Sequence, residues 1–127
     1  MTGTSCYTKA GNLPCDYIIH TVGPIFNNYK ECEADVLLKL AVINTLNLAS
    51  SMEDVKTLSI PAISSGIYGF PKQDCARIMI ESVFKWALTG KTGKLREVRL
   101  CNFDDPTVKV FKDHFLTVFE DIAEESV

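Results

Sequence analysis

The sequence predicts an α/β domain with a mostly parallel sheet and helices on both faces. Short β-rich runs alternate with longer segments of helical periodicity, and glycine or proline separates most of them. Alternation of this kind is typical of strands joined by covering helices. The 127 residues, 46% hydrophobic and 23% charged, suit one globular domain spanning 1–127.

The expected strands are short. Clear β-rich runs cover Tyr17–Val22, Thr57–Ile63 and Arg96–Phe103, and Ser5–Lys9 is a further candidate. Sheets usually contain about five or six strands, so we expect the domain to be incomplete at its N-terminus and to lack its first strands.

Three helices are expected between and after these strands. Glu31–Ser51 carries an apolar stripe of Val36, Leu40, Ile43 and Leu46. Lys72–Leu88 carries a stripe of Ala76, Met79, Ile80, Val83, Phe84 and Ala87. The segment after Pro106 carries one of Val108, Phe111, Phe115, Val118, Phe119 and Ile122. Missing strands would leave such large residues uncovered, so we expect self-association or marginal stability.

Charge does not favour a nucleic-acid partner. The net charge is -3, and the densest basic group, Lys91, Lys94, Arg96 and Arg99, is better interpreted as a solvated turn and strand edge. Five cysteines without C-x-x-C spacing favour neither disulfides nor a metal site, and we expect mostly buried thiols. Without a membrane-length apolar run or signal peptide, we expect a cytoplasmic or nuclear protein with no membrane partner.

The segment Ser64–Pro71 carries the strongest chemical signal. It follows a strand and opens a helix, and its two glycines let the backbone curl closely round a ligand. Successive N–H groups there can form an anion nest, to which the helix N-terminus adds positive potential. On composition alone, an ordinary strand-to-helix connection is an equally good interpretation.

Two motifs make the interpretation specific. Pro61–Pro71 reads P-A-I-S-S-G-I-Y-G-F-P and resembles the diphosphate-binding segment of the macrodomain family of ADP-ribose-binding modules. Upstream, Thr8–Cys15 and Ile18–Pro24 resemble the family's other hallmark, in the right order and separated by a long helix. The resemblance covers essentially the whole chain and is greatest to macrodomains of poly-ADP-ribose-polymerase-like proteins.

The resemblance implies binding of ADP-ribose or ADP-ribosylated proteins, with no cofactor. The backbone N–H groups of the loop would wrap the pyrophosphate, and Tyr68 would cover the proximal part of the ligand. Asn102 and Phe103 would lie by the adenine, with Phe103 stacked on it or, nearly as readily, serving as a core aromatic. The implied binding residues are Ser64, Ser65, Gly66, Ile67, Tyr68, Gly69, Phe70, Asn102 and Phe103.

The chain also departs from the family's pattern. The family's fold normally begins further upstream, with a portion that contains an Asn-Ala-Ala-Asn stretch and a Gly-rich loop. This chain contains no Asn-Ala-Ala-Asn and no Gly-Gly-Gly segment. In hydrolytic members of the family, the catalytic Asn and Asp lie in that upstream portion. We therefore expect weakened binding and no catalytic residue. The alternatives are an ADP-ribosyl hydrolase when complete, or a binding-dead interaction module. His20 and Cys75 are better interpreted as core residues than as catalytic ones.

Overall fold

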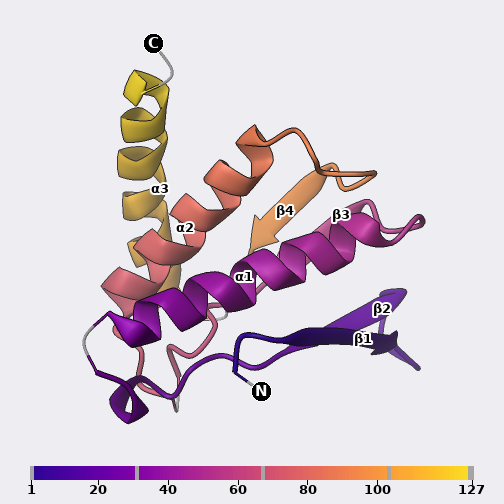
Figure 1. Ribbon diagram of the computed structural model, residues 1–127, viewed down its shortest axis with the longest axis horizontal. Coiled ribbons are helices and arrows are strands. Elements are labelled where there is room, and N and C mark those ends of the chain that lie inside the picture. The colour runs from indigo at the N-terminus through magenta and orange to yellow at the C-terminus, as the bar shows by residue number, and fades with distance from the viewer. Residues whose placement is uncertain (1, 31, 67, 103, 126–127) are drawn as a thin grey trace.

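The computed structural model describes residues 2–30, 32–66, 68–102 and 104–125, with side chains to residue 120 (Figure 1). All three expected helices and all four strand candidates are confirmed. Their bounds are β1 (Ser5–Lys9), β2 (Tyr17–Thr21), the short 3-10 helix η1 (Phe26–Asn28), α1 (Glu33–Ser51), β3 (Thr57–Ile60), α2 (Lys72–Leu88), β4 (Glu97–Leu100) and α3 (Asp105–Glu125).

The described strands form two separate pairs instead of one continuous sheet. Strands β1 and β2 are antiparallel, with a register that runs from Ser5 opposite Thr21 to Lys9 opposite Tyr17. Strands β3 and β4 are parallel, with Thr57 opposite Glu97 and Ile60 opposite Leu100. The expected single, mostly parallel sheet is therefore interrupted between β2 and β3.

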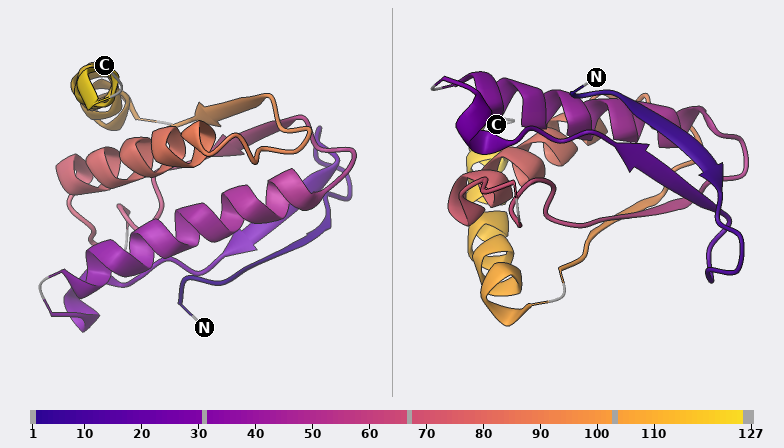
Figure 2. Two further views of the ribbon diagram at one scale, coloured as in Figure 1. Left: turned by 45° about the horizontal axis from the view of Figure 1, so that its top comes forward. Right: turned by 90° about the horizontal axis from the view of Figure 1, so that it is seen from below.

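Strand direction still places the candidate site at one edge. The arrows of β1 and β4 point in opposite directions in Figure 1, so β2, β3 and β4 run the same way. Their carboxyl ends lead into Gly23-Pro24, residues 61–71 and residues 101–104. Helix α2 contacts both α1 and α3, and α1 lies beside α2 in both views of Figure 2.

The buried face of α1 differs from the expected stripe. Val36 and Leu40 are 63% and 44% exposed, so the prediction was wrong for both residues, although Leu46 is fully buried. The buried residues of α1 are Ala34, Leu38, Ala41, Val42, Thr45, Leu46 and Ala49. Three of these seven residues are alanines, and α1 contacts α2. The expected stripe was assigned from large apolar residues alone, so it lay on a neighbouring face of the helix.

Helix α2 shows a smaller difference. Ala76, Met79 and Ile80 are buried as expected, whereas Val83 and Phe84 are half-buried and Ala87 is exposed. Trp86 is buried instead, and its indole Nε1 donates a 2.9 Å hydrogen bond to Asn47 Oδ1 of α1. That bond lets a residue with a polar atom enter the interface between the two helices.

Helix α3 buries only part of its apolar stripe. Phe111 and Val118 are buried, but Phe115 and Phe119 are 46% and 51% exposed. Their rings lie 5.3 Å and 6.0 Å from the ring of Phe84 on α2. Ile122 lies outside the described side chains. The uncovered aromatic rings fit the expectation that this surface lacks a partner layer, which remains a prediction.

The surface chemistry of the described residues is ordinary. Lys94 pairs with Glu53 at 3.0 Å, and Arg99 pairs with Glu97 at 2.9 Å, as expected for a solvated turn and strand edge. The expectation of mostly buried thiols was wrong, because only Cys75 is buried, while Cys6, Cys15, Cys32 and Cys101 are exposed. Among the described helices, none has the length and apolarity to cross a bilayer.

Candidate functional site

The predicted loop lies at the carboxyl end of β3 and leads into α2. Ser64 adopts a φ of 65°, a left-handed conformation that no other described non-glycine residue has. Its hydroxyl oxygen is buried and lacks a hydrogen-bond partner among the described residues. Strained backbone and an unpaired buried hydroxyl are both costly, and such features gather at sites that bind ligands.

The backbone N–H groups of the loop divide into two sets. The N–H groups of Ser65, Gly69 and Phe70 donate to carbonyl oxygens of Ala62, Gly66 and Ser64, respectively, at 3.3, 3.0 and 2.8 Å. These three groups hold the loop in shape and are not free for a phosphate. The N–H groups of Gly66 and Tyr68 have no backbone partner in the described part of the chain, so they are the candidates for phosphate binding. Ile67 lies outside the described residues.

The three glycines in and beside the loop meet different structural requirements. Gly69 has a φ of 75°, which favours glycine. A Cβ at Gly66 would meet nothing within 4 Å. A Cβ at Gly23 would overlap Ser64 Oγ and the Ile63 side chain, so the end of β2 packs directly on the loop. The two motifs that were singled out in the sequence therefore meet in space.

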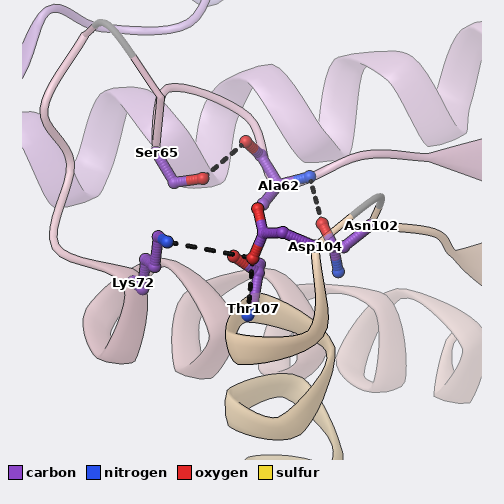
Figure 3. A network of polar contacts seen from close by, with 6 residues as sticks. All are labelled: Ala62, Ser65, Lys72, Asn102, Asp104 and Thr107. Atoms are coloured by element: carbon purple, nitrogen blue, oxygen red, sulfur yellow. Dashed lines mark hydrogen bonds and ion pairs between the residues drawn. The ribbon is translucent and has the colours of Figure 1, made fainter.

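A polar network connects the loop to the end of β4 (Figure 3). Asn102 Oδ1 accepts a 3.0 Å hydrogen bond from the Ala62 backbone N–H, which ties the carboxyl ends of β3 and β4 together. Ser65 Oγ donates to the Ala62 carbonyl oxygen at 3.0 Å. Asn102 thus lies beside the loop, with its amide oxygen held by the protein. Phe103, expected to stack on adenine, lies outside the described residues.

Asp104 caps α3 and faces the start of α2. Its Oδ1 accepts a 2.8 Å hydrogen bond from the Thr107 N–H and lies 3.9 Å from Lys72 Nζ. The hydrogen bonds from Thr107, with a contribution from Lys72, hold the pKa of the Asp104 carboxyl below its ordinary value. Lys72 faces this carboxylate, and the N-terminus of α2, which no side chain caps, contributes positive potential at the loop.

Replacement of Asp104 with alanine is expected to lower the melting temperature by about 4 °C, since a lost N-cap weakens the helix. Asp104→Asn keeps an acceptor oxygen and serves as the control. The carboxylate contributes fully above its ordinary pKa of 3.8, and the contribution is lost as pH falls through the lowered folded-state pKa. Calorimetric melts should therefore show the advantage over Asp104→Asn shrinking below about pH 4. A pH-independent difference would contradict this role.

Two other candidates are clarified by the structure. His20 is exposed on β2, and its Nε2 lies 2.9 Å from Thr8 Oγ1, so the prediction of a core histidine was wrong. Four of the five residues of β1 are exposed and no residue of β2 is fully buried, which an apolar sequence context does not reveal. Cys75 is buried, as expected, and burial raises the pKa of its thiol to about 12. It is therefore a poor nucleophile.

The aromatic residues of the loop have separate positions. Phe70 is 1% exposed and packs edge-on against Phe26, with ring centroids 5.1 Å apart. Its side chain is therefore part of the core, and only its backbone contributes to the surface of the loop. Tyr68 is 43% exposed, and its carbonyl oxygen accepts a 2.9 Å hydrogen bond from the Phe26 N–H. The side chain of Tyr68 is therefore accessible at the loop, and its expected role in covering a ligand remains a prediction. Within the described residues, no cluster of His, Cys, Asp or Glu could hold a metal ion.

A groove that sequence reasoning missed runs from the loop between β2 and β3. It has a volume of about 1120 Å³, and Gly23, Ser64 and Tyr68 line it where it meets the loop. At the other end, the Tyr17 hydroxyl donates a 2.6 Å hydrogen bond to Asp54 Oδ2, which raises the tyrosine pKa. No local sequence pattern reports a groove between strands that are far apart in the chain.

Comparisons with known proteins agree with this geometry. The Macro domain family profile matches residues 1–79. The chain is 40% identical over 112 residues to mouse protein mono-ADP-ribosyltransferase PARP9, covering 87% of this chain and 13% of that protein. It is 42% identical over 102 residues to O-acetyl-ADP-ribose deacetylase 1 of Pantoea vagans, covering 80% of this chain and 57% of the deacetylase.

Solved structures give the same result. The Oceanobacillus iheyensis macrodomain with ADP superposes with a TM-score of 0.86 at 27% identity, covering 95% of this chain and 61% of that one. The chain thus spans less than two thirds of the length of these relatives. The α/β fold is that of a macrodomain, truncated relative to the solved ones. This chain belongs to the Macro domain family.

Proposed function

We propose that the chain recognises ADP-ribose, free or attached to a protein, through the loop between β3 and α2. The observation that carries this proposal is the buried, unpaired hydroxyl of Ser64 on a strained backbone beside an uncapped helix N-terminus. Anions bind such N-termini because N–H groups and the helix dipole point at them. The resemblance to a macrodomain solved with ADP supports a diphosphate as the anion.

The proposed contacts follow from the described groups. The N–H groups of Gly66 and Tyr68 donate to oxygens of the diphosphate, and the Ser64 hydroxyl, which lies against Gly23, joins them only after rotating toward the ligand. Tyr68 covers the ligand from the solvent side, while Asn102 lies at the adjoining strand end. A few charge-assisted hydrogen bonds contribute about 1.5–3 kcal/mol each before the entropy of association is subtracted. A micromolar dissociation constant requires a binding free energy of about -8 kcal/mol, so we expect ADP-ribose to bind more weakly than that.

Calorimetric titration tests this proposal directly. ADP-ribose is expected to bind detectably at millimolar concentration and more tightly than AMP, because AMP lacks the second phosphate that the loop can contact. Inorganic phosphate is the control for a nonspecific anion. If ADP-ribose binds no better than inorganic phosphate, the recognition proposal fails, and the chain is better described as an interaction module.

Hydrolysis is the second candidate function, because the chain resembles an O-acetyl-ADP-ribose deacetylase. The described site offers it little support, because the buried Cys75 thiol has a pKa of about 12 and is a poor nucleophile. To separate the two functions, a mono-ADP-ribosylated protein is incubated with the chain, and release of ADP-ribose is followed over time. Recognition without catalysis predicts binding with no release above that of the chain-free control.

A further inference from the structure

Strand β4 has an outer edge that faces away from β3. Within the described residues, β4 pairs with β3 and with no other strand. The Glu97 N–H donates to the Lys56 carbonyl oxygen at 3.3 Å, and the Cys101 N–H donates to the Ile60 carbonyl oxygen at 2.9 Å. The peptide groups of Glu97 and Cys101 are therefore turned toward β3.

The residues between them can be assigned to a side, because peptide groups alternate along a strand. Arg99 lies two residues from each and shares the orientation toward β3. Val98 and Leu100 direct their N–H and C=O groups outward, where they form no backbone hydrogen bond in the described part of the chain. An exposed edge of this kind is a template for pairing with a strand of another chain.

Apolar surface adjoins this edge. A cavity of about 890 Å³ lies between β4, α2 and α3. Val98 and Leu100 line it from β4, and Phe84 lines it from α2. On its α3 wall, Phe115 and Leu116 are 46% and 63% exposed. Uncovered apolar surface beside an open strand edge is typical of a protein interaction site.

The charges on β4 indicate which partner fits. Glu97 and Arg99 lie two residues apart on one exposed face of the strand, and their side chains form a 2.9 Å ion pair. An antiparallel copy of β4 centred on Val98 would place Glu97 of each copy opposite Arg99 of the other. A parallel copy in the same register would instead place like charges opposite each other. Opposite charges directly across two strands stabilise their pairing, and like charges weaken it.

We propose that two copies of this chain associate through antiparallel pairing of their β4 edges, with Val98 on the twofold axis. The two Val98 residues exchange N–H···O=C hydrogen bonds. Each Leu100 N–H donates to the Arg96 carbonyl oxygen of the other copy, which points outward because the following N–H faces β3. Such an interface uses the same patch on both chains, as twofold dimers do.

The same axis brings the two apolar surfaces together. An axis perpendicular to the sheet keeps α2 and α3 of both copies on one face, so the two cavities adjoin over the joined strands. Phe115 and Leu116 of each copy then face apolar surface of the other instead of solvent. The pairing does not depend on the proposed recognition of ADP-ribose, because it uses the edge of β4 and not the loop.

Light scattering coupled to gel filtration tests the association without nucleotide, from low to several hundred micromolar chain. A monomer–dimer equilibrium is expected. Arg99→Glu should raise the dimer dissociation constant at least tenfold, because it places like charges opposite each other twice. Combining it with Glu97→Arg restores opposite charges across the axis and should restore the dimer. Since ADP-ribose is absent, failure of ligand recognition would not alter these outcomes.

A second pair of variants tests the apolar part of the interface. Leu116→Glu puts a carboxylate where the cavities adjoin, so it should weaken the dimer at least tenfold. Val36→Glu is the matched control, because Val36 is also an apolar helix residue that is 63% exposed, but it lies on α1. The control should leave the dissociation constant unchanged. Equal effects of the two substitutions would contradict an interface at α3.

Amide hydrogen exchange followed by NMR locates the contact. Exchange at the outward-facing amides of Val98 and Leu100 should slow at least tenfold as chain concentration rises. The Arg99 amide, which faces β3, should change far less. A chain that stays monomeric, a dimer that the doubly substituted chain does not restore, or open-ended aggregation without protection at Val98 would overturn the proposal. Concentration-dependent protection confined to the groove between β2 and β3 would also overturn it.

Discussion

Gly66→Glu is expected to lower ADP-ribose affinity at least about a hundredfold while leaving the fold intact. A Cβ at Gly66 meets no atom within 4 Å, and its φ is not in the left-handed range, so the backbone accepts a side chain. The new carboxylate would lie where the loop is proposed to hold a phosphate. Two unit charges about 4 Å apart repel by about 1 kcal/mol in water and about 4 kcal/mol near a protein surface. Calorimetric titration at millimolar ADP-ribose should therefore detect no binding to this variant.

Gly66→Ala is the matched control for this substitution. It adds a methyl group at the same open position without charge, and we expect its melting temperature to equal or slightly exceed that of the unsubstituted chain. ADP-ribose affinity should fall much less than in Gly66→Glu. If the glutamate variant is folded and binds as tightly as the alanine variant, the diphosphate does not lie over Gly66, and the proposed binding mode is wrong.

The secondary structure could be predicted from the sequence because its determinants are local. Strand runs end at Gly23-Pro24, and helical stripes end near Gly90, so the order of strands and helices follows from residues close together in the chain. The buried face of α1 could not be predicted as well, since it depends on the close contact with α2. Leu38 and Ala41 are buried there, whereas Val36 is exposed.

The site was predictable at the level of the loop but not of individual atoms. The sequence located Ser64–Pro71 between a strand and a helix, as the structure shows. It did not reveal that the loop consumes N–H groups of Ser65 and Phe70, or that Asn102 holds Ala62. Those bonds depend on backbone dihedrals and on contacts between segments about 40 residues apart. The binding roles themselves remain predictions.

The groove between β2 and β3 could not be predicted from the sequence for a similar reason. Each wall is recognisable as a strand from its own residues, but strand pairing is non-local and no periodicity reports it. Counting strands against the usual sheet size predicted that strands were missing, without indicating where the sheet is interrupted. The hydrogen-bond pattern around Lys56 and Ile60 supplies that position, because it assigns each peptide group to one side of β3.

Phe70→Ala is expected to lower the free energy of unfolding by about 3–5 kcal/mol, the usual cost of emptying a buried aromatic site. Phe70 is 1% exposed, contacts the Phe26 ring edge-on and belongs to the main core. Single domains are typically stable by only about 5–15 kcal/mol, so this loss removes a large share of the stability and would unfold the chain if it is marginally stable. Urea unfolding followed by circular dichroism measures the change.

Phe70→Leu separates the structural role of this side chain from ligand contact. Leucine keeps much of the buried volume, so this variant should remain folded with a smaller loss of stability. Because the Phe70 N–H is bonded to the Ser64 carbonyl and the ring faces Phe26, ADP-ribose affinity should change less than threefold. A folded Phe70→Leu chain that no longer binds ADP-ribose would show that the ring itself contacts the ligand. The loop would then have to open in the complex, because the ring now lies within the core.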